Sequence, residues 1–432
     1  MTILSDSILH KFLEPLIGGW QRSLDQLDKG MWRLLLIGFF LSSCASRSGY
    51  RQGLEASIEK LGANVSLAHL ELDDQGELLS RDQLKAVTEQ IQKESQEDPI
   101  LLVVFIHGWN RNASYHERTG GKDLAHFRTW LSELSERDPE YRTMGVMVSW
   151  RGRSLSPFPI GVDFFHRYAA ARRMGGVIGA EVLHEIGATA RASNQRSRIM
   201  MMGHSMGGAI LESCFSEAIA SKVAVSHAQR RPLLRTDFPA DLLITINSAE
   251  SAIHARQLIS TFKRRGIRDV EGGPLIVSVT SQDDLATAFA YPIGNALGRY
   301  VPPFNWFNTS VSGVYRKKSQ LDQLQGTQAQ AHRTTVGHFT PLFSHRYREG
   351  PRETRTLKEI LEDNKAAQGP GGVVVAGETR TFYFERPQEP FYNDSPYWIM
   401  PVPGAIMKDH RDIWNHSFLG MVSALMSIVE SP

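Results

Sequence analysis

Runs of consecutive apolar residues, rich in β-branched side chains, recur along the chain from about residue 99 onward. The first and clearest, 99–106, fits a strand that is buried on both faces, because its hydrophobicity is uninterrupted. The pattern predicts strands over 99–106, 144–150, 198–202, 241–246, 275–280 and 397–402. Segments with helical spacing follow them, over 121–137, 166–192, 206–221, 250–265 and 413–429. Repeated strand–helix units predict an α/β fold whose mostly parallel central sheet is covered by helices on both faces.

Two regions interrupt this alternation. Residues 288–335 are first aromatic and Pro-rich, then Gln- and Lys-rich, and we expect a lid-like insert or a segment that packs over the sheet edge. Residues 364–376 are rich in Gly and Ala, which predicts an exposed loop. Three histidines in or near the insert are interpreted as surface or lid residues: His332, His338 and His345.

A short apolar run near the N-terminus, 34–41, is preceded by Met31 and Arg33 and followed by small residues and Cys44. It is shorter than the roughly 20 residues that span a bilayer, and its flanks are typical of a signal peptide. The segment 41–44 resembles the bacterial lipobox. That resemblance implies lipid attachment at Cys44, a polar tether from residue 45, and a membrane-anchored lipoprotein in the bacterial cell envelope, at the outer membrane or periplasmic side.

Thirty residues precede Met31, which is unusual for such a signal, so we expect translation to begin at Met31 rather than at Met1. Residues 1–30 also fit an amphipathic helix on a membrane surface, and a short buried hydrophobic segment is a third interpretation. If the signal is not used, the protein is cytoplasmic.

The composition argues against several classes of function but does not indicate which of the remaining ones applies. Of 432 residues, 41% are hydrophobic and 22% charged, which is ordinary for a globular protein. The net charge of +2 and the lack of a basic block argue against a nucleic-acid partner. Two cysteines, Cys44 and Cys214, cannot build a disulfide framework, and Cys214 is expected in the core. The 15 histidines have no metal spacing, so we expect neither a metal nor a cofactor.

A G-x-S-x-G pattern at 203–207 places Ser205 between the strand 198–202 and the helix 206–221. This strand–turn–helix context is what the nucleophile motif requires. A serine on so sharp a turn needs small neighbours, here Gly203 and Gly207, and the helix start favours developing negative charge. The alternative is a capping serine at a Gly-rich helix start.

His107-Gly108-Trp109 ends the first strand. In acyl transfer the substrate oxygen becomes an anion, which two preset N–H groups can stabilise. We expect these donors at Trp109 and at Met206, the residue after the nucleophile. A glycine turn with a buried Trp is the other interpretation.

Together, 105–109 and 203–208 resemble the α/β-hydrolase superfamily, which includes lipases and esterases. The resemblance covers roughly 99–430. With the lipobox-like segment, it predicts an N-terminal extension and signal over 1–44, a tether and the start of the domain over 45–98, and the catalytic domain over 99–432. It also implies the chain order serine, acid, histidine.

For the acid, Asp284 follows the strand 275–280, in a segment resembling a Ser-x-x-Asp-x-Ala-Thr pattern of related hydrolases. Asp283 is the first alternative and Glu250 the second. For the base, His410 lies in a loop after the strand 397–402, whereas His416 falls within or beside the last helix. A histidine must take the serine's proton and a carboxylate must orient it, and we favour Asp284 and His410.

These expectations predict a serine hydrolase that cleaves carboxylic esters, small-molecule or lipid, through an acyl-enzyme. Acyl transfer to an alcohol uses the same residues, as do thioesterases and peptidases. A surface lipoprotein that only binds its partner is the non-enzymatic alternative. The acyl chain, the alcohol and the oligomeric state stay open.

Overall fold

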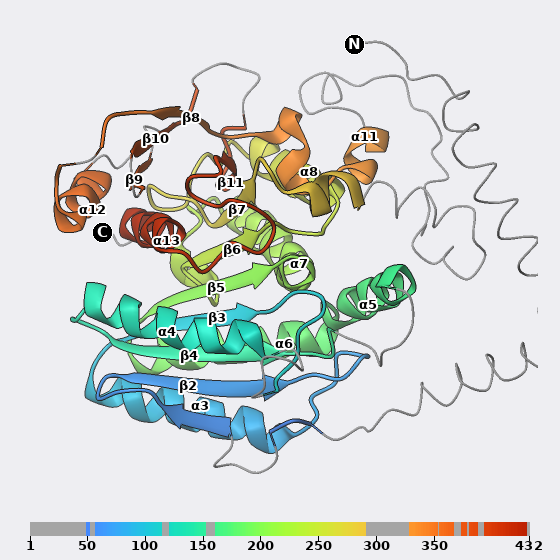
Figure 1. Ribbon diagram of the computed structural model, residues 1–432, viewed down its shortest axis with the longest axis vertical. Coiled ribbons are helices and arrows are strands. Elements are labelled where there is room, and N and C mark those ends of the chain that lie inside the picture. The colour runs from blue at the N-terminus through green and yellow to red at the C-terminus, as the bar shows by residue number, and fades with distance from the viewer. Residues whose placement is uncertain are drawn as a thin grey trace, which may run out of the picture. The chain divides into compact units, whose positions relative to one another are not determined.

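The central element of the structure, a computed structural model, is an eight-stranded sheet whose strands come from both the N-terminal and the C-terminal parts of the described residues (Figure 1). Those residues are 49–51, 57–114, 121–152, 160–290, 328–352, 354–366, 373–377, 380–387 and 393–429. The chain divides into two units, 1–47 with 155–157 and 48–154 with 158–432, and every described residue belongs to the second. The signal segment with Cys44, and most of the insert predicted over 288–335, lie outside the described residues.

The sheet has eight strands in the order β1-β2-β4-β3-β5-β6-β7-β11. Every pair is parallel except β1 with β2. The strands are β1 (Ile58–Lys60), β2 (Val65–Glu71), β3 (Ile100–Ile106), β4 (Arg142–Ser149), β5 (Arg198–His204), β6 (Leu242–Ile246), β7 (Ile276–Ser281) and β11 (Tyr397–Val402). The predicted α/β class with a mostly parallel sheet is confirmed, and β1 and β2 extend the sheet to residues before 99.

The apolar strands are explained by two cores, one on each face of the sheet. In β3, Leu102 and Val104 belong to one core, while Val103 and Phe105 belong to the other. Since successive side chains point to opposite faces, a strand covered on both sides must be apolar throughout.

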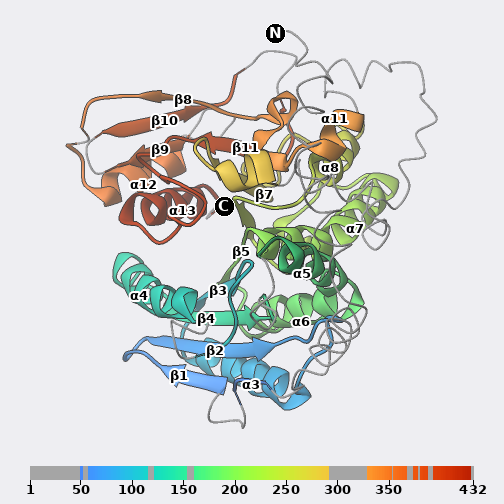
Figure 2. The ribbon, with the colours of Figure 1, turned by 45° about the vertical axis from the view of Figure 1, so that its right-hand side comes forward.

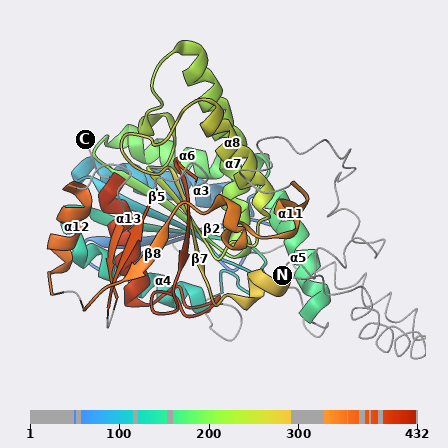
Figure 3. The same cartoon turned by 90° about the horizontal axis from the view of Figure 1, so that it is seen from above.

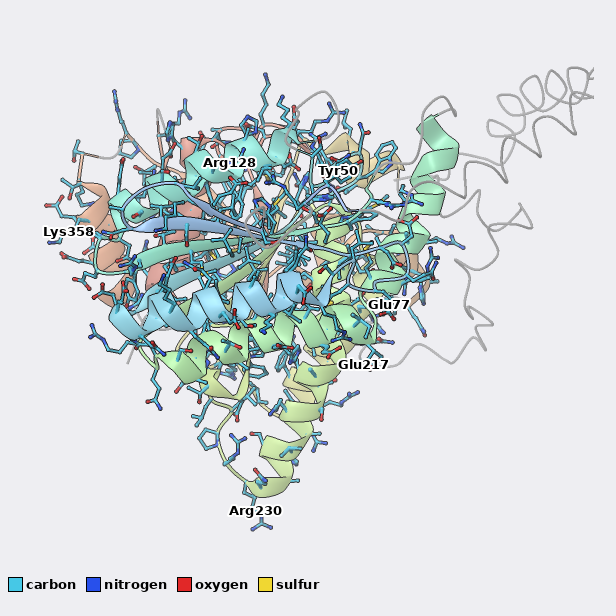
Figure 4. All side chains as sticks on the ribbon, turned by 90° about the horizontal axis from the view of Figure 1, so that it is seen from below. Tyr50, Glu77, Arg128, Glu217, Arg230 and Lys358 are labelled. Atoms are coloured by element: carbon cyan, nitrogen blue, oxygen red, sulfur yellow. The ribbon has the colours of Figure 1, made fainter. Side chains whose placement is uncertain are left out.

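Helices cover both faces (Figure 3). The first core takes residues from α3 (Arg81–Glu97), α5 (Ile160–Met174), α6 (Val177–Ser193), α7 (Met206–Gln229) and α8 (Ala252–Arg264). The second takes residues from α4 (Lys122–Arg137) and α13 (His416–Val429). Figure 4 shows both sides at once, with Arg128 marking α4 and Arg230 marking the end of α7, which projects beyond the sheet.

The single helix predicted over 166–192 is wrong, because two helices, α5 and α6, occupy this stretch. The break falls at Gly175 and Gly176, and Gly176 is extended with φ −78° and ψ −159°. A Cβ at Gly175 would lie 2.4 Å from the Cβ of Ser213, so the bend lets α7 approach closely. Helical periodicity continues across the bend and therefore hides it.

A second sheet lies between β7 and β11 in the chain, with antiparallel order β8-β10-β9 (Figure 2). Its strands are β8 (Arg346–Glu349), β9 (Val373–Ala376) and β10 (Thr381–Glu385), and α12 (Leu357–Ala366) precedes β9. The predicted exposed loop over 364–376 is therefore wrong at both ends. Val373 and Val375 are buried in the second core, but a run of four residues is too short to signal a strand.

His345 corrects a second expectation. It is buried rather than at the surface, its Nδ1 lies 2.8 Å from Ser344 Oγ, and burial lowers its pKa to about 3. Cys214 is buried as predicted, which raises its thiol pKa to about 12. Within the described ranges, no helix combines the length and the hydrophobicity needed to cross a bilayer. In the same ranges, no three His, Cys, Asp or Glu side chains gather as metal ligands would.

Candidate active site

Ser205 lies between the end of β5 and the start of α7, with φ 55° and ψ −117°. This conformation is rare for a residue with a side chain and costs about 1–3 kcal/mol. The surroundings hold it: the Ser205 N–H donates to Ile246 O at 2.9 Å, and its carbonyl accepts from Ala249 N at 3.1 Å. The predicted sharp turn therefore exists and is fixed by the end of β6.

Close backbone approach explains the glycines around this turn. A Cβ at Gly203 would lie 2.3 Å from Gly207 O, and a Cβ at Gly207 would lie 2.1 Å from Ile106 O. A Cβ at Gly108 would lie 2.9 Å from the Cβ of Ser205. Side chains at these positions would separate β3, β5 and α7, so the turn requires glycine.

Three of the predicted residues meet in a line. His410 Nε2 lies 3.0 Å from Ser205 Oγ, and His410 Nδ1 lies 2.8 Å from Asp284 Oδ2. Ser205 comes from the end of β5, Asp284 from the loop after β7, and His410 from the loop after β11. All three strands are parallel, so their carboxyl ends meet at one edge of the sheet, where open α/β sheets place their sites.

The Asp284 carboxylate is buried and accepts four hydrogen bonds. Its Oδ2 accepts from His410 and from Thr287 Oγ1 at 2.5 Å. Its Oδ1 accepts from the N–H groups of Ala286 at 2.9 Å and Thr287 at 3.2 Å. Burial raises the pKa of Asp284, but the hydrogen bonds and the charge of His410 outweigh it and lower the pKa below its usual value. The carboxylate is thus held as an anion.

The alternatives lie elsewhere. Asp283 is exposed. His416 is the first residue of α13 and lies 3.1 Å from Glu133, with 73% of its side chain exposed. Glu250 is buried, but it accepts from Ser251 N at 2.9 Å and does not contact the line of three.

The predicted oxyanion donors flank Ser205. Met206 is the first residue of α7, and N–H groups of a helix's first turn have no partner within the helix. Trp109 follows β3 directly after Gly108, whose backbone approaches Ser205. Met206 therefore follows Ser205 directly in the chain, and Trp109 follows the glycine that approaches Ser205.

His107 fixes the loop that carries Trp109. Trp150 N–H donates to His107 Nε2 at 3.2 Å, so Nδ1 carries the hydrogen and donates to Gly108 O at 2.9 Å. Burial lowers the pKa of His107 to about 4 and keeps the ring neutral. The neutral ring thus ties the loop to the end of β4.

The backbone of His410 is held from two neighbouring strand ends. Its carbonyl accepts from His204 Nε2 at 2.7 Å and from Asn247 Nδ2 at 3.1 Å. Asn247 Oδ1 in turn accepts from Ser281 N at 2.9 Å. Burial lowers the pKa of His204 to about 4, so the neutral ring donates through Nε2. We call His204 and Asn247 the carbonyl clamp.

Sequence reasoning missed Asn247, Thr287 and His338 as members of this site. Asn247 directly follows β6, a position at the carboxyl end of a parallel strand that could have drawn attention. Thr287 lies within the Ser-x-x-Asp-x-Ala-Thr pattern, but the pattern alone did not indicate that its hydroxyl contacts Asp284. His338 Nε2 lies 3.0 Å from Thr287 Oγ1, and no local pattern indicates that contact.

Compared with models of protein families and with curated proteins, the sequence matches none. The function must therefore be argued from the geometry of the site.

Proposed function

We propose that this protein is a serine hydrolase of the α/β-hydrolase type that cleaves carboxylic esters through an acyl-enzyme. The observation that carries the proposal is the line from Ser205 through His410 to Asp284, with separations of 3.0 and 2.8 Å. Nucleophile, base and orienting carboxylate in this order are the minimum that serine-based acyl transfer needs. The strained turn at Ser205 and the chain order of the three residues support the same assignment.

In the proposed mechanism, Ser205 Oγ attacks the ester carbonyl while its proton passes to His410 Nε2. Asp284 holds the Nδ1 hydrogen of His410 and stabilises the cation that forms. His410 then gives its proton to the leaving alcohol, and the acyl group stays on Ser205. Water, deprotonated by His410, hydrolyses this acyl-enzyme and restores the serine.

Each tetrahedral intermediate carries a negative oxygen, which the N–H groups of Trp109 and Met206 would bind. Losing one such donor typically costs 10²–10³ in kcat. The start of α7 adds the positive end of the helix dipole on the same side.

The proposed substrates are small-molecule or lipid esters. A lipid anchor at Cys44, proposed from the sequence alone, would place the enzyme at a bacterial envelope membrane. Product analysis with an added alcohol separates hydrolysis from acyl transfer.

A fluorophosphonate probe tests the mechanism, because it reacts only with an activated serine. The wild type should be labelled and should cleave p-nitrophenyl esters, whereas Ser205→Ala should lose both activities. Ser216→Ala serves as the control and should retain both, because the Ser216 hydroxyl lies on α7 and donates to Glu212 O at 2.6 Å. Equal labelling of wild type and Ser205→Ala would disprove the assignment.

A further inference from the structure

Thr287 and His338 extend the hydrogen-bonded series of Ser205, His410 and Asp284 beyond Asp284. Thr287 Oγ1 lies 2.5 Å from Asp284 Oδ2, and His338 Nε2 lies 3.0 Å from the same hydroxyl oxygen. The contacts thus run without a break from Ser205 through His410, Asp284 and Thr287 to His338.

The positions of the hydrogens in this series of contacts can be assigned. A hydroxyl has one hydrogen to donate, and the shorter contact to a carboxylate is the stronger one. Thr287 therefore donates to Asp284, and its oxygen accepts from Nε2 of His338. Burial lowers the pKa of His338, while the facing Asp284 raises it and His410 lowers it. The neutral ring with its hydrogen on Nε2 is the form that fits.

The position of His338 is fixed by its neighbours in the chain as well as by the contacts of its own side chain with Thr287 and the Asp284 backbone. It ends a short turn, η6 (Val336–His338). Val336 N–H donates to Glu250 O at 3.1 Å, and Thr335 Oγ1 donates to Thr287 O at 3.3 Å. A Cβ at Gly337 would lie 1.8 Å from Thr280 Oγ1, so the turn packs directly on β7.

We propose that His338 and Thr287 form a positioning relay for Asp284: His338 orients the Thr287 hydroxyl, and the hydroxyl fixes Oδ2 toward His410. The relay deepens the proposed function and rests on it. Without His338, the hydroxyl can rotate away, and Oδ2 keeps only His410 as a donor. Oδ1 stays held by the N–H groups of Ala286 and Thr287, but Oδ2 can then shift, and the imidazole loses part of its fixed orientation. The relay therefore acts on the chemical step and leaves substrate binding unchanged.

Two matched pairs of variants test the relay, with kcat and KM measured separately on a p-nitrophenyl ester. His338→Leu removes the donor, whereas His338→Gln can offer an amide N–H near the position of Nε2. Thr287→Val removes the hydroxyl and keeps the shape, whereas Thr287→Ser keeps the hydroxyl. We expect His338→Leu and Thr287→Val each to lower kcat about tenfold at constant KM, the loss of one hydrogen bond to a charged group. His338→Gln and Thr287→Ser should each retain most of the wild-type kcat.

The double variant His338→Leu/Thr287→Val decides whether the two residues act as a unit. A relay predicts a loss in kcat no larger than that of either single variant, since breaking one link already frees Asp284. Full kcat in His338→Leu, an equal loss in His338→Gln, or additive losses in the double variant would each overturn the relay. If His338→Leu does not fold, the isosteric Thr287 pair gives the same test. A wild type without esterase activity would refute the proposed function instead, so the two failures can be told apart.

Discussion

Replacing Asp284 by asparagine should abolish most activity without disturbing the fold, because the site dictates how the new amide must lie. The Oδ1 position faces two backbone donors, the N–H groups of Ala286 and Thr287. An amide nitrogen there would meet two hydrogens, so the asparagine oxygen takes this position. The NH₂ group is thereby forced into the Oδ2 position, opposite His410.

The consequence is the wrong tautomer of the base. An amide N–H facing Nδ1 makes Nδ1 an acceptor, so the hydrogen of His410 moves to Nε2. Nε2 then points a hydrogen at Ser205 Oγ, 3.0 Å away, and cannot take the serine's proton. The same substitution in a serine protease triad lowers kcat about 10⁴-fold, which corresponds to about 5.5 kcal/mol of transition-state stabilisation. We expect a loss of this order here.

Steady-state hydrolysis of a p-nitrophenyl ester measures this loss, and the melting temperature shows whether the fold survives. Asp283→Asn is the matched control: the same chemical change one residue earlier, on an exposed side chain, should leave kcat unchanged. A folded Asp284→Asn variant that keeps a tenth or more of wild-type kcat would refute the reasoning, as would a larger loss in Asp283→Asn.

Three further predictions concern other parts of the chain. Asn247→Leu removes one of the two members of the carbonyl clamp and leaves the buried Ser281 N–H without its acceptor, which should cost about 1–3 kcal/mol and lower both the melting temperature and kcat. An unchanged melting temperature would contradict it. Burial, and to a lesser extent the charge of Glu250, raises the pKa of Glu212 from 4.5 to about 8. The contribution of protonated Glu212 to the free energy of unfolding is therefore complete below pH 4.5. It is lost as the pH rises through 8, at about 1.4 kcal/mol per pH unit. Glu212→Gln should flatten this decline in melting temperature between pH 5 and 9, and equal slopes would count against it. Radiolabelled palmitate should mark the wild type and not Cys44→Ala in a bacterial host, and equal labelling would remove the anchor.

The strands and the turn at Ser205 could be predicted because their causes are local. A strand buried on both faces must be apolar along its length; β3 meets that condition throughout, and β5 meets it from Ile199 to Met202. The glycines beside Ser205 are required by close backbone contacts, and those contacts recur wherever such a turn forms. Residue type and order along the chain therefore sufficed for these parts.

The missed parts depend on contacts between distant segments. β2 joins the sheet by pairing with β4, and β1 joins it by pairing with β2, although their own sequences mix polar and apolar residues. The contact between Thr287 and His338 joins residues 51 positions apart and depends on how η6 packs on β7. No local periodicity encodes either arrangement, so a single sequence could not reveal them.

Hydrogen bonds from the ends of two strands hold the backbone of His410, the proposed base, and they distinguish it from His416. The carbonyl of His410 accepts hydrogen bonds from residues at the ends of β5 and β6, which are adjacent parallel strands. The first of these residues, His204, directly precedes Ser205 in the chain, so base and nucleophile share one support. His416 begins α13, where its side chain is largely exposed and faces Glu133. Under the proposed function, the hydrogen bond between His410 and the strand that carries Ser205 favours His410 over His416 as the base.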